Sequence, residues 1–357
     1  MATVDVTVIG GGIFGLAVAE ACADRGARVR LIESRAIGAG SSGGLVGALA
    51  PHVPESWNDK KAFQLESLLM GEAYWARIAA LSGIDPGYAR TGRLQPLADE
   101  AALDLARSRA EGARELWRGR AEWRVVPAGS FPGWSPHSPS GFVVHDTLSA
   151  RIAPRRAAAA LAGAIRVHGG EIVLGEARAE GRVVWATGYE GLAALSAALG
   201  RDTGTGVKGQ SLSVRHEAAR LPQIFGDGLH LIPHDDGTVA IGSSTERHWD
   251  QPDTTDAETV EGLRKRAVGL CPALDGAAVV ERWAGVRPRA QSRAPVLGPW
   301  PDRPGHYIAN GGFKIGLGVA PMVGVAMAAL VLEDEDRIPP GFRPDALGLG
   351  RKGESPR

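Results

Sequence analysis

Apolar and polar residues alternate along the chain in patterns that divide it into short strands and longer helices. Near the N-terminus, a β-branched stretch over 4–9 predicts a strand, and the apolar run 13–24 predicts a helix. Gly26 is placed to end that helix, and a second strand is expected over 28–32. The same criteria predict helices over 57–83, 101–120 and 254–270, a turn with a helix over 148–170, a turn with a strand over 91–97, and strands over 171–174, 182–188, 211–214, 229–233 and 238–242.

A glycine-rich turn joins the first strand to the first helix. Gly10, Gly12 and Gly15 have the spacing G-x-G-x-x-G, and Ile13 and Phe14 open the helix between the last two glycines. In a dinucleotide site, the first glycine permits the tight turn, the second lets the backbone approach a pyrophosphate, and the third lets the helix pack closely on the strand. The helix N-terminus adds N–H groups and a positive dipole end. We interpret the turn as a dinucleotide site. The alternative is a glycine-rich turn of another α/β fold, and the motif alone does not separate NAD from FAD.

An acidic residue and a run of small residues follow the second strand. Glu33 lies at the end of that strand, where a carboxylate accepts hydrogen bonds from both ribose hydroxyls and disfavours a 2′-phosphate. Residues 35–52 are rich in glycine and other small residues. Serine hydroxyls in this segment can donate to phosphates, and its glycines allow the backbone to approach a ligand closely. A flexible surface loop is the alternative. The candidate cofactor-binding residues in this part are Glu33, Ser34, Arg35, Ser41, Ser42, Gly43, Gly47, Ala48 and Leu49.

Composition narrows the class of protein. The chain has 357 residues, of which 44% are hydrophobic, as in an ordinary globular protein. Its formal net charge is zero, which argues against nucleic acid or an anionic membrane as the main partner. The two cysteines form no disulfide framework and no signal peptide is visible, so we expect a cytoplasmic location. The apolar run 319–332 is too short to span a bilayer and predicts a buried helix. No metal site is expected, because no H-E-x-x-H or C-x-x-C spacing occurs.

The opening segment resembles a known family of flavoenzymes. The sequence Gly-Ala-Gly-Ser-Ser-Gly-Gly over 38–44, after the glycine turn, is similar to the FAD-dependent D-amino acid oxidase-like (DAO) superfamily, which includes glycine and sarcosine oxidases. The resemblance implies FAD rather than NAD. It also implies an α/β and α+β fold, in which a Rossmann-type FAD-binding domain is interleaved with a substrate domain built on a mixed or antiparallel sheet. We expect 1–50, 145–206 and 286–335 to form the FAD-binding domain, 51–144 and 207–285 the substrate-binding domain, and 336–357 a C-terminal tail.

Two later segments carry the same resemblance. The family has an Ala-Thr-Gly turn where the chain passes the FAD, and Ala186, Thr187 and Gly188 match it. Residues 283–289 resemble the family's G-[LV]-R-P motif, whose arginine binds the substrate carboxylate in glycine and D-amino acid oxidases. The resemblance therefore implies that Arg287 binds the carboxylate, and Gly285 and Arg287 also join the cofactor-binding candidates. A planar, permanently charged fork suits a carboxylate, although an ion pair with a structural carboxylate is the alternative.

The segment before the last apolar helix adds further candidates. In the family this helix points its N-terminus at the flavin, where a positive dipole end stabilises the negative charge of the reduced ring. By resemblance, Lys314 meets a substrate carboxylate or assists dioxygen, and a lysine that merely snorkels is the alternative. His230 replaces a tyrosine of glycine oxidase and is either a polar ligand to the substrate or a core histidine. The cofactor-binding candidates here are Gly312, Gly316, Leu317 and Gly318, with a helix start that binds no ligand as the alternative.

Together these features predict an FAD-dependent oxidase or dehydrogenase that oxidises the C–N bond of an amino acid or secondary amine. The resemblance implies hydride transfer to flavin N5, and dioxygen or another acceptor reoxidises the flavin. Because 287–301 contains no cysteine, we expect FAD to be non-covalent. Arg287, Lys314 and His230 are the candidate catalytic residues. Two alternatives are the same chemistry on a modified tRNA base or another secondary amine, and a flavin-binding subunit without turnover.

Overall fold

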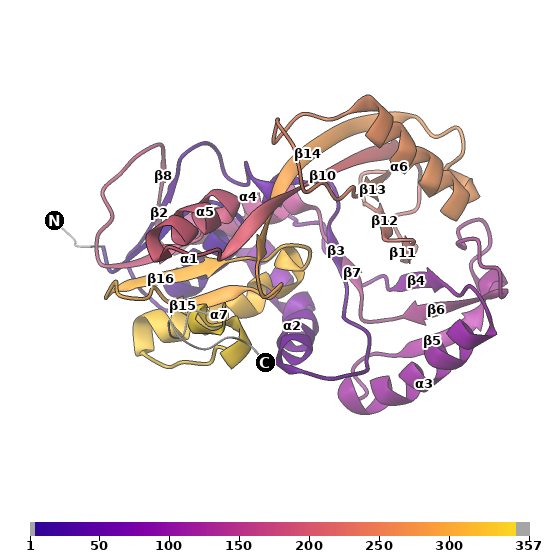
Figure 1. Cartoon of the computed structure of the whole chain (residues 1–357), viewed down its shortest axis with the longest axis horizontal. Coiled ribbons are helices and arrows are strands. Elements are labelled where there is room, and N and C mark those ends of the chain that lie inside the picture. The colour runs from indigo at the N-terminus through magenta and orange to yellow at the C-terminus, as the bar shows by residue number, and fades with distance from the viewer. Residues whose placement is uncertain (1–3, 348–357) are drawn as a thin grey trace.

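A six-stranded sheet carries the glycine turn. In the computed structural model, which describes residues 4–347, β1 pairs in parallel with β2 on one side and β9 on the other. Strands β8 and β16 extend the parallel sheet, and β15 closes one edge antiparallel to β16 (Figure 1). The spatial order is β15 (Val296–Pro299), β16 (His306–Asn310), β9 (Arg182–Trp185), β1 (Val6–Ile9), β2 (Val29–Glu33) and β8 (Glu171–Leu174).

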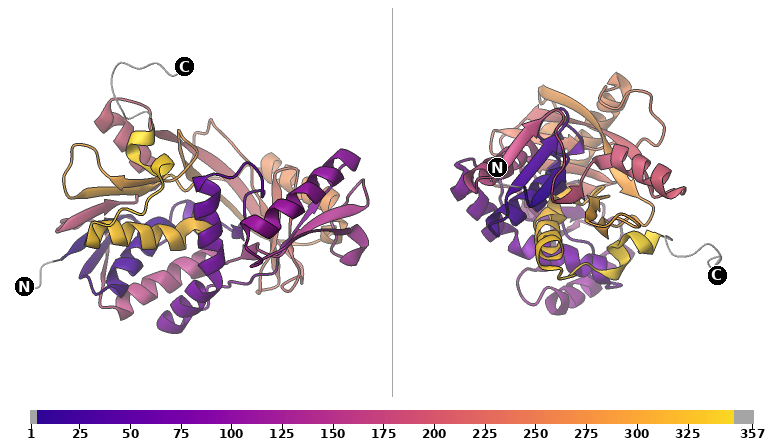
Figure 2. Two further views of the ribbon diagram at one scale, coloured as in Figure 1. Left: turned by 90° about the horizontal axis from the view of Figure 1, so that it is seen from below. Right: turned by 90° about the vertical axis from the view of Figure 1, so that its left-hand side faces the viewer.

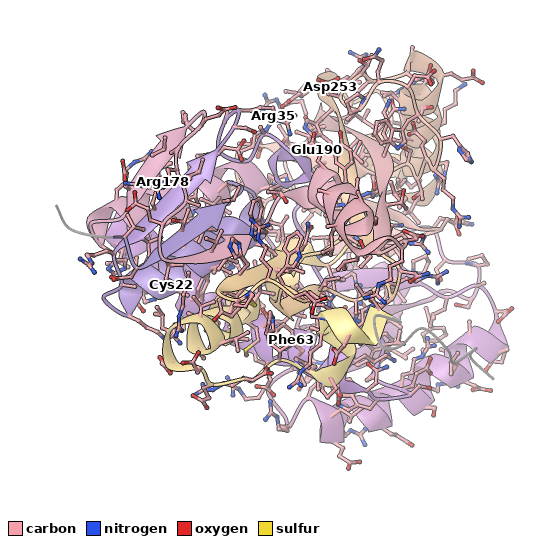
Figure 3. The ribbon with its side chains drawn as sticks, turned by 60° about the vertical axis from the view of Figure 1, so that its left-hand side comes forward. Cys22, Arg35, Phe63, Arg178, Glu190 and Asp253 are labelled. Atoms are coloured by element: carbon pink, nitrogen blue, oxygen red, sulfur yellow. The ribbon has the colours of Figure 1, made fainter. Side chains whose placement is uncertain are left out.

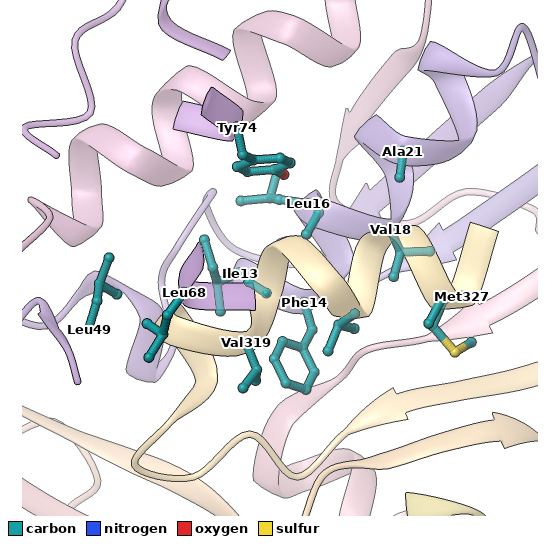
Figure 4. Packing of buried hydrophobic residues seen from close by; sticks show 14 of the residues in the cluster. Ile13, Phe14, Leu16, Val18, Ala21, Leu49, Leu68, Tyr74, Val319 and Met327 are labelled. Carbon is teal, nitrogen blue, oxygen red and sulfur yellow. The ribbon is translucent and has the colours of Figure 1, made fainter. Parts of the chain in front are cut away.

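Helix α1 (Ile13–Asp24) is buried between this sheet and α7 (Gly316–Glu333). Figure 4 shows Phe14 of α1 and Val319 of α7 in the same apolar cluster. The two helix backbones come close because α7 has a glycine at the crossing, where a Cβ on Gly324 would lie 2.6 Å from the carbonyl oxygen of Ala17. Helix α7 has the length and composition of a membrane span, but 67% of it is buried inside the protein. It is therefore the buried core helix that the sequence predicts.

An eight-stranded mixed sheet forms the other half of the molecule, on the right in Figure 1. Its two longest strands, β10 and β14, have 12 residues each and pair antiparallel from Gly204 and Ala290 onward. At that end they pack against α5, whereas α6 packs against β10 (Figure 1). The spatial order is β14 (Val279–Ala290), β10 (Gly204–Arg215), β13 (Thr238–Gly242), β12 (Leu229–Pro233), β11 (Gln223–Gly226), β4 (Arg93–Pro96), β6 (Phe142–Asp146) and β5 (Trp123–Pro127).

Helices cover both halves, as the two views in Figure 2 show. Three of them begin after a side chain that accepts a hydrogen bond from the first turn: Asn58 before α2, Asp99 before α3 and Asp256 before α6. The remaining elements are α2 (Asp59–Ser82), α3 (Glu100–Leu116), α4 (Pro154–Val167), α5 (Gly188–Leu199), α6 (Ala257–Leu270), β3 (Ala48–Leu49), β7 (Ala150–Arg151), η1 (Ser41–Gly43), η2 (Ala128–Ser130), η3 (Pro272–Leu274), η4 (Pro340–Phe342) and η5 (Pro344–Leu347).

The fold class expected from the sequence is confirmed. Elements α1, β8, β12 and β13 have the expected bounds, and residues 175–181 form a short loop instead of a strand meander. Helix α5 was not predicted, because only Leu192 and Leu195 of its residues are buried and its periodic signal is weak. Strand β10 is longer than the expected 211–214, because pairing with β14 extends it to Gly204.

The expected domain boundaries remain a prediction, but sheet membership adds detail to them. Strands β10 and β14 belong to the mixed sheet over their whole lengths, so the boundaries expected at 206/207 and 285/286 fall inside these strands. Helix α2 lies in the segment 51–144, yet it packs against α4 and α7 beside the parallel sheet.

Residues 336–347 pack against the body of the protein, although the sequence predicts a polar tail there. Phe342 is only 2% exposed, and its ring makes an edge contact with Phe63 at 5.0 Å between ring centroids. Ile338 and Leu347 are also buried. These apolar residues stand singly among prolines and charges, so they produce no periodic pattern that sequence analysis could detect. Positions 348–357 of the expected tail lie outside the described residues.

The contact between Phe342 and Phe63 leads to a prediction about stability. Phe342→Ala should lower the free energy of unfolding by about 3 kcal/mol, because it removes a buried aromatic side chain and leaves a cavity. Asp345→Ala, an exposed change in the same segment, should alter it by less than about 0.5 kcal/mol. Denaturant titration of the FAD-loaded protein measures both changes. Equal and small effects of the two substitutions would show that the segment does not dock.

Candidate functional site

Two connected cavities open between the parallel sheet and the mixed sheet. The first cavity, of about 440 Å³, is lined by the C-terminal ends of β1, β2, β9 and β16. The second cavity, of about 240 Å³, lies against the mixed sheet. They share Ile13, Ser41, Ser42, Phe313 and Gly316, so they form one continuous cleft. An elongated ligand can therefore run from the glycine turn to the mixed sheet.

The three glycines of the turn have different physical roles. Gly10 has a φ of +111°, and a Cβ there would lie 2.4 Å from the carbonyl oxygen of Ala186. A Cβ on Gly15 would lie 1.9 Å from the carbonyl oxygen of Gly10, so this glycine lets α1 pack on the strand end. Gly12 lines the first cavity, and a Cβ there would meet only the Ser42 hydroxyl, at 3.3 Å. Gly12 is thus the glycine that leaves room for a ligand.

Ser42 connects the small-residue segment to the start of α1. Its hydroxyl accepts a hydrogen bond of 2.9 Å from the backbone N–H of Ile13. Gly12, the residue before the helix, has no side chain to do this. Ser42 therefore caps α1 across 29 positions of sequence and fixes η1 against the cavity wall. Sequence analysis assigned Ser42 a ligand-binding role and did not foresee this capping.

Glu33 is fixed on the wall of the first cavity by the backbone. One carboxylate oxygen accepts from the N–H of Gly11 at 2.7 Å, and the other accepts from the N–H of Arg35 at 2.8 Å. Each oxygen keeps a lone pair, so ribose hydroxyls can still donate to the carboxylate. Arg35 and Glu190 of α5 line the same cavity, and both are labelled in the upper part of Figure 3.

This arrangement fits FAD on physical grounds. The first cavity joins a glycine that leaves room for phosphate, a helix N-terminus and a fixed carboxylate at the end of the second strand. Gly316 lies at the N-terminus of α7 and lines both cavities, so a second positive dipole end meets the middle of the cleft. Cys22 and Cys271 are buried and line neither cavity, which agrees with the expected non-covalent FAD.

Six of the expected site residues line neither cavity, and packing explains several of them. A Cβ on Gly47 would lie 1.6 Å from the carbonyl oxygen of Ile152, so Gly47 serves the close approach of two chain segments. A Cβ on Gly285 would meet the Trp283 ring at 2.4 Å. Small residues carry the same sequence signal whether they face a ligand or another backbone. The six are Gly15, Gly43, Gly47, Leu49, Gly285 and Gly318.

Sequence analysis also missed residues that the fold brings to the cleft. Phe313 lines both cavities with a φ of +42°, a left-handed conformation that is uncommon for a bulky residue. Because Phe313 lies between Gly312 and Lys314, two candidate site residues, its position in the sequence could have indicated that it lines the site. No local signal marks the others, because they reach the cleft from elements far apart in the sequence: Gly175, Glu176, Ala177, Tyr189, Glu190, Asn310, Gly209, Ser211, Phe225, Ser243 and Trp283.

Arg287, on β14, lines the second cavity and is held by the protein. One terminal nitrogen (Nη1) donates to the Ser243 hydroxyl at 2.6 Å, and the other (Nη2) donates to the carbonyl oxygens of Ser244 at 2.8 Å and Lys208 at 3.2 Å. Its Nε is buried without a partner in the described structure. Burial lowers the pKa of Arg287 to about 10, and the charge of Glu246 opposes this shift. Arg287 thus presents a fixed positive charge with part of its fork already engaged, whereas the sequence suggested an open fork.

His230, on β12, lines the second cavity as an uncharged side chain. Burial lowers its pKa to about 3, and the positive charges of Arg93 and Lys314 act in the same direction. The imidazole packs on Phe225 with ring centroids 4.5 Å apart. Its Nδ1 is buried without a partner in the part of the chain that the structure describes. His230 therefore lies at the cavity wall in a neutral form beside Phe225, which lines the same cavity, and its expected role as a ligand to the substrate stays a prediction.

Lys314, just before α7, also lines the second cavity. It is exposed, and the residues described in the structure give it no hydrogen bond and no ion pair. Partial burial lowers its pKa, and the nearby charge of Arg287 lowers it further. Both cations approach the Phe313 ring, with the Arg287 guanidinium carbon 5.6 Å and the Lys314 Nζ 5.8 Å from the ring centroid.

One group of acidic and histidine side chains has the closeness of a metal site within the described residues. It consists of Glu20, Asp24 and His168. The guanidinium of Arg77 already lies 2.8 Å from Glu20 and 3.2 Å from Asp24. A cation of the protein itself therefore neutralises these carboxylates, and none of the three residues lines either cavity.

Comparisons with known proteins agree with this geometry. Residues 5–330 match the family model described as DAO, FAD dependent oxidoreductase. The chain is 28% identical over 362 residues to a glycine oxidase of Geobacillus kaustophilus, with 93% of each chain covered. Its fold is similar to that of a glycine oxidase of Bacillus cereus, with a TM-score of 0.81, 22% identity and coverage of 99% and 100%. It is also similar to iminodiacetate oxidase of Chelativorans sp. BNC1, with a TM-score of 0.80, 22% identity and coverage of 94% and 97%.

The family match extends over almost all of the described chain, and it includes the glycine turn, the Arg287 strand and α7. The expected cofactor, FAD, and the expected class of enzyme, an oxidoreductase of the amino acid oxidase type, are thereby confirmed. The individual site residues remain predictions that rest on the geometry above. This chain belongs to the DAO family of FAD-dependent oxidoreductases.

Proposed function

We propose that this protein oxidises the C–N bond of a small amine that carries a carboxylate, such as an amino acid or an N-substituted glycine. The observation that supports this substrate is the fixed charge of Arg287 in a cavity continuous with the FAD cavity. The relatives named as glycine oxidase and iminodiacetate oxidase support the same class, because both names denote amines that carry carboxylates.

The cofactor and the chain divide the work. FAD, when bound, accepts a hydride from the substrate carbon and later passes two electrons to dioxygen or another acceptor. The substrate loses that hydride and one proton from nitrogen and becomes an imine, which water hydrolyses to a carbonyl compound and an amine. Arg287 binds the carboxylate and so orients the neighbouring C–H bond within the cleft.

The second cavity offers no charged base for this reaction. None of its lining residues is acidic, and His230 is uncharged at neutral pH because its pKa is about 3. A substrate with a neutral amine needs no base to lose a hydride, so the wall composition is consistent with the proposed reaction. The N-terminus of α7, at Gly316, adds a positive dipole end that stabilises negative charge in the cleft.

A substrate panel tests the proposal. Purified FAD-loaded protein is mixed anaerobically with glycine, sarcosine, D-alanine and proline, and in parallel with methylamine and dimethylamine, which lack the carboxylate. At least one carboxylated amine should bleach the flavin absorbance, and its counterpart without a carboxylate should not. Peroxide formation and dye reduction in air then identify the electron acceptor. If no amine of either set bleaches the flavin, the protein binds FAD without this activity.

Substitution of Arg287 gives a second prediction. Arg287→Met should lower kcat/KM for the carboxylated substrate about 10²-fold, mainly through KM, because it removes a charge-assisted contact worth about 3 kcal/mol. Arg289→Met is the matched control, because Arg289 approaches the same Phe313 ring at 6.0 Å but lines neither cavity. FAD content and Tm are measured for both variants. Equal losses in the two variants would contradict a specific carboxylate contact by Arg287.

A further inference from the structure

The second cavity holds more positive charge than one carboxylate balances. Arg287 and Lys314 both line it, His230 is neutral, and none of its lining residues is acidic. Glu246, whose negative charge acts on Arg287, lines neither cavity and contacts other residues. It accepts from the amide nitrogen of Gln210 at 3.1 Å and lies 3.9 Å from the ammonium of Lys208.

The two cations differ in how they are held. Arg287 is fixed by Ser243, Ser244 and the backbone of Lys208, so its charge has one position. Lys314 has no hydrogen bond or ion pair to any residue in the described structure, and it keeps three N–H donors. The charge of Arg287 lowers the pKa of Lys314, as expected for two cations that line the same cavity. Because Lys314 is exposed to the cavity, its three N–H donors are accessible to an anion that enters beside Arg287.

We propose that the substrate of this site carries two anionic groups, one bound by Arg287 and the second by Lys314. The chemical class is a small amine with two carboxylates, in which the second acid group lies a few bonds from the amine nitrogen. This inference rests on the proposed function and names the substrate class of the same site. Lys314 then determines specificity, because a substrate with a single carboxylate leaves its charge unpaired.

Two other roles for Lys314 are physically reasonable and give different outcomes. In the first, Lys314 and Arg287 bind the same carboxylate, and a second acid group adds nothing. In the second, Lys314 stabilises negative charge on the cofactor, and its loss affects all substrates equally. Only the two-anion arrangement predicts a difference between diacids and monoacids that depends on Lys314.

Binding of unreactive ligands separates these roles. Diglycolate and methoxyacetate form a matched pair, because both are ethers without an oxidisable amine and they differ by one carboxylate. Calorimetric titration of the FAD-loaded protein at constant ionic strength should give at least tenfold tighter binding of diglycolate. In Lys314→Met the ratio of the two dissociation constants should fall to about one, and in Lys314→Arg it should persist. Lys265→Met, an exposed change on α6, should leave the ratio unaltered.

Oxidation assays complete the test. The wild-type ratio of kcat/KM for iminodiacetate over sarcosine, which also differ by one carboxylate, should exceed ten and fall about tenfold in Lys314→Met. Oxidation of sarcosine with no preference for the diacid in binding or turnover would overturn this inference and leave the proposed function intact. A loss that is equal for both acids in Lys314→Met would also overturn it. If diglycolate shows the expected preference but no amine is oxidised, the proposed function fails and the two-anion site stands.

Discussion

The structure depends on one close backbone contact, between the turn after β1 and the end of β9. Gly10 adopts a φ of +111° there, and its α-carbon faces the carbonyl oxygen of Ala186 at a distance that excludes any Cβ. Gly15 repeats this constraint one helical turn later, because its α-carbon lies against the carbonyl of Gly10. Together the two glycines place the N-terminus of α1 at the open end of the parallel sheet. The position of Gly12 on the cavity wall, and therefore the whole first cavity, follows from that placement.

The second constraint is the long antiparallel pair of β10 and β14. These strands belong to the mixed sheet, but their ends at Gly204 and Ala290 reach α5 beside the parallel sheet. Arg287 of β14 therefore belongs to the mixed sheet and also lines the cleft. The carbonyl oxygen of Lys208, on the neighbouring strand β10, accepts a hydrogen bond from its guanidinium. A rigid two-stranded ribbon is a suitable support for a charge that must keep one orientation. It also couples the substrate side of the cleft to the cofactor side without a flexible linker.

Charge is distributed unevenly along the cleft. The cofactor end contains Glu33, fixed by two backbone N–H groups, and Glu190 of α5. The substrate end contains Arg287 and Lys314, with a histidine that burial keeps neutral. Glu246, whose charge acts on Arg287, accepts hydrogen bonds from Gln210 and Ser244 and lines neither cavity. The cleft therefore separates a region suited to sugar hydroxyls from a region suited to anions.

The sequence by itself determined the dinucleotide-binding unit, and its resemblance to a known family indicated the fold class and FAD. The periods of strand and helix, the glycine spacing and Glu33 are local features, and each acts within about 30 residues of chain. The tertiary structure alone decided which small residues face the cleft. Gly47 and Gly285 meet other chain segments instead of a ligand, and Ser42 caps a helix that is distant in sequence. It also decided that Arg287 is already partly engaged and that Lys314 has no partner in the described chain, because both facts depend on elements brought together from different sheets. The type of a residue determines whether another chain segment can approach it closely. The packing of the whole chain determines which segment does so.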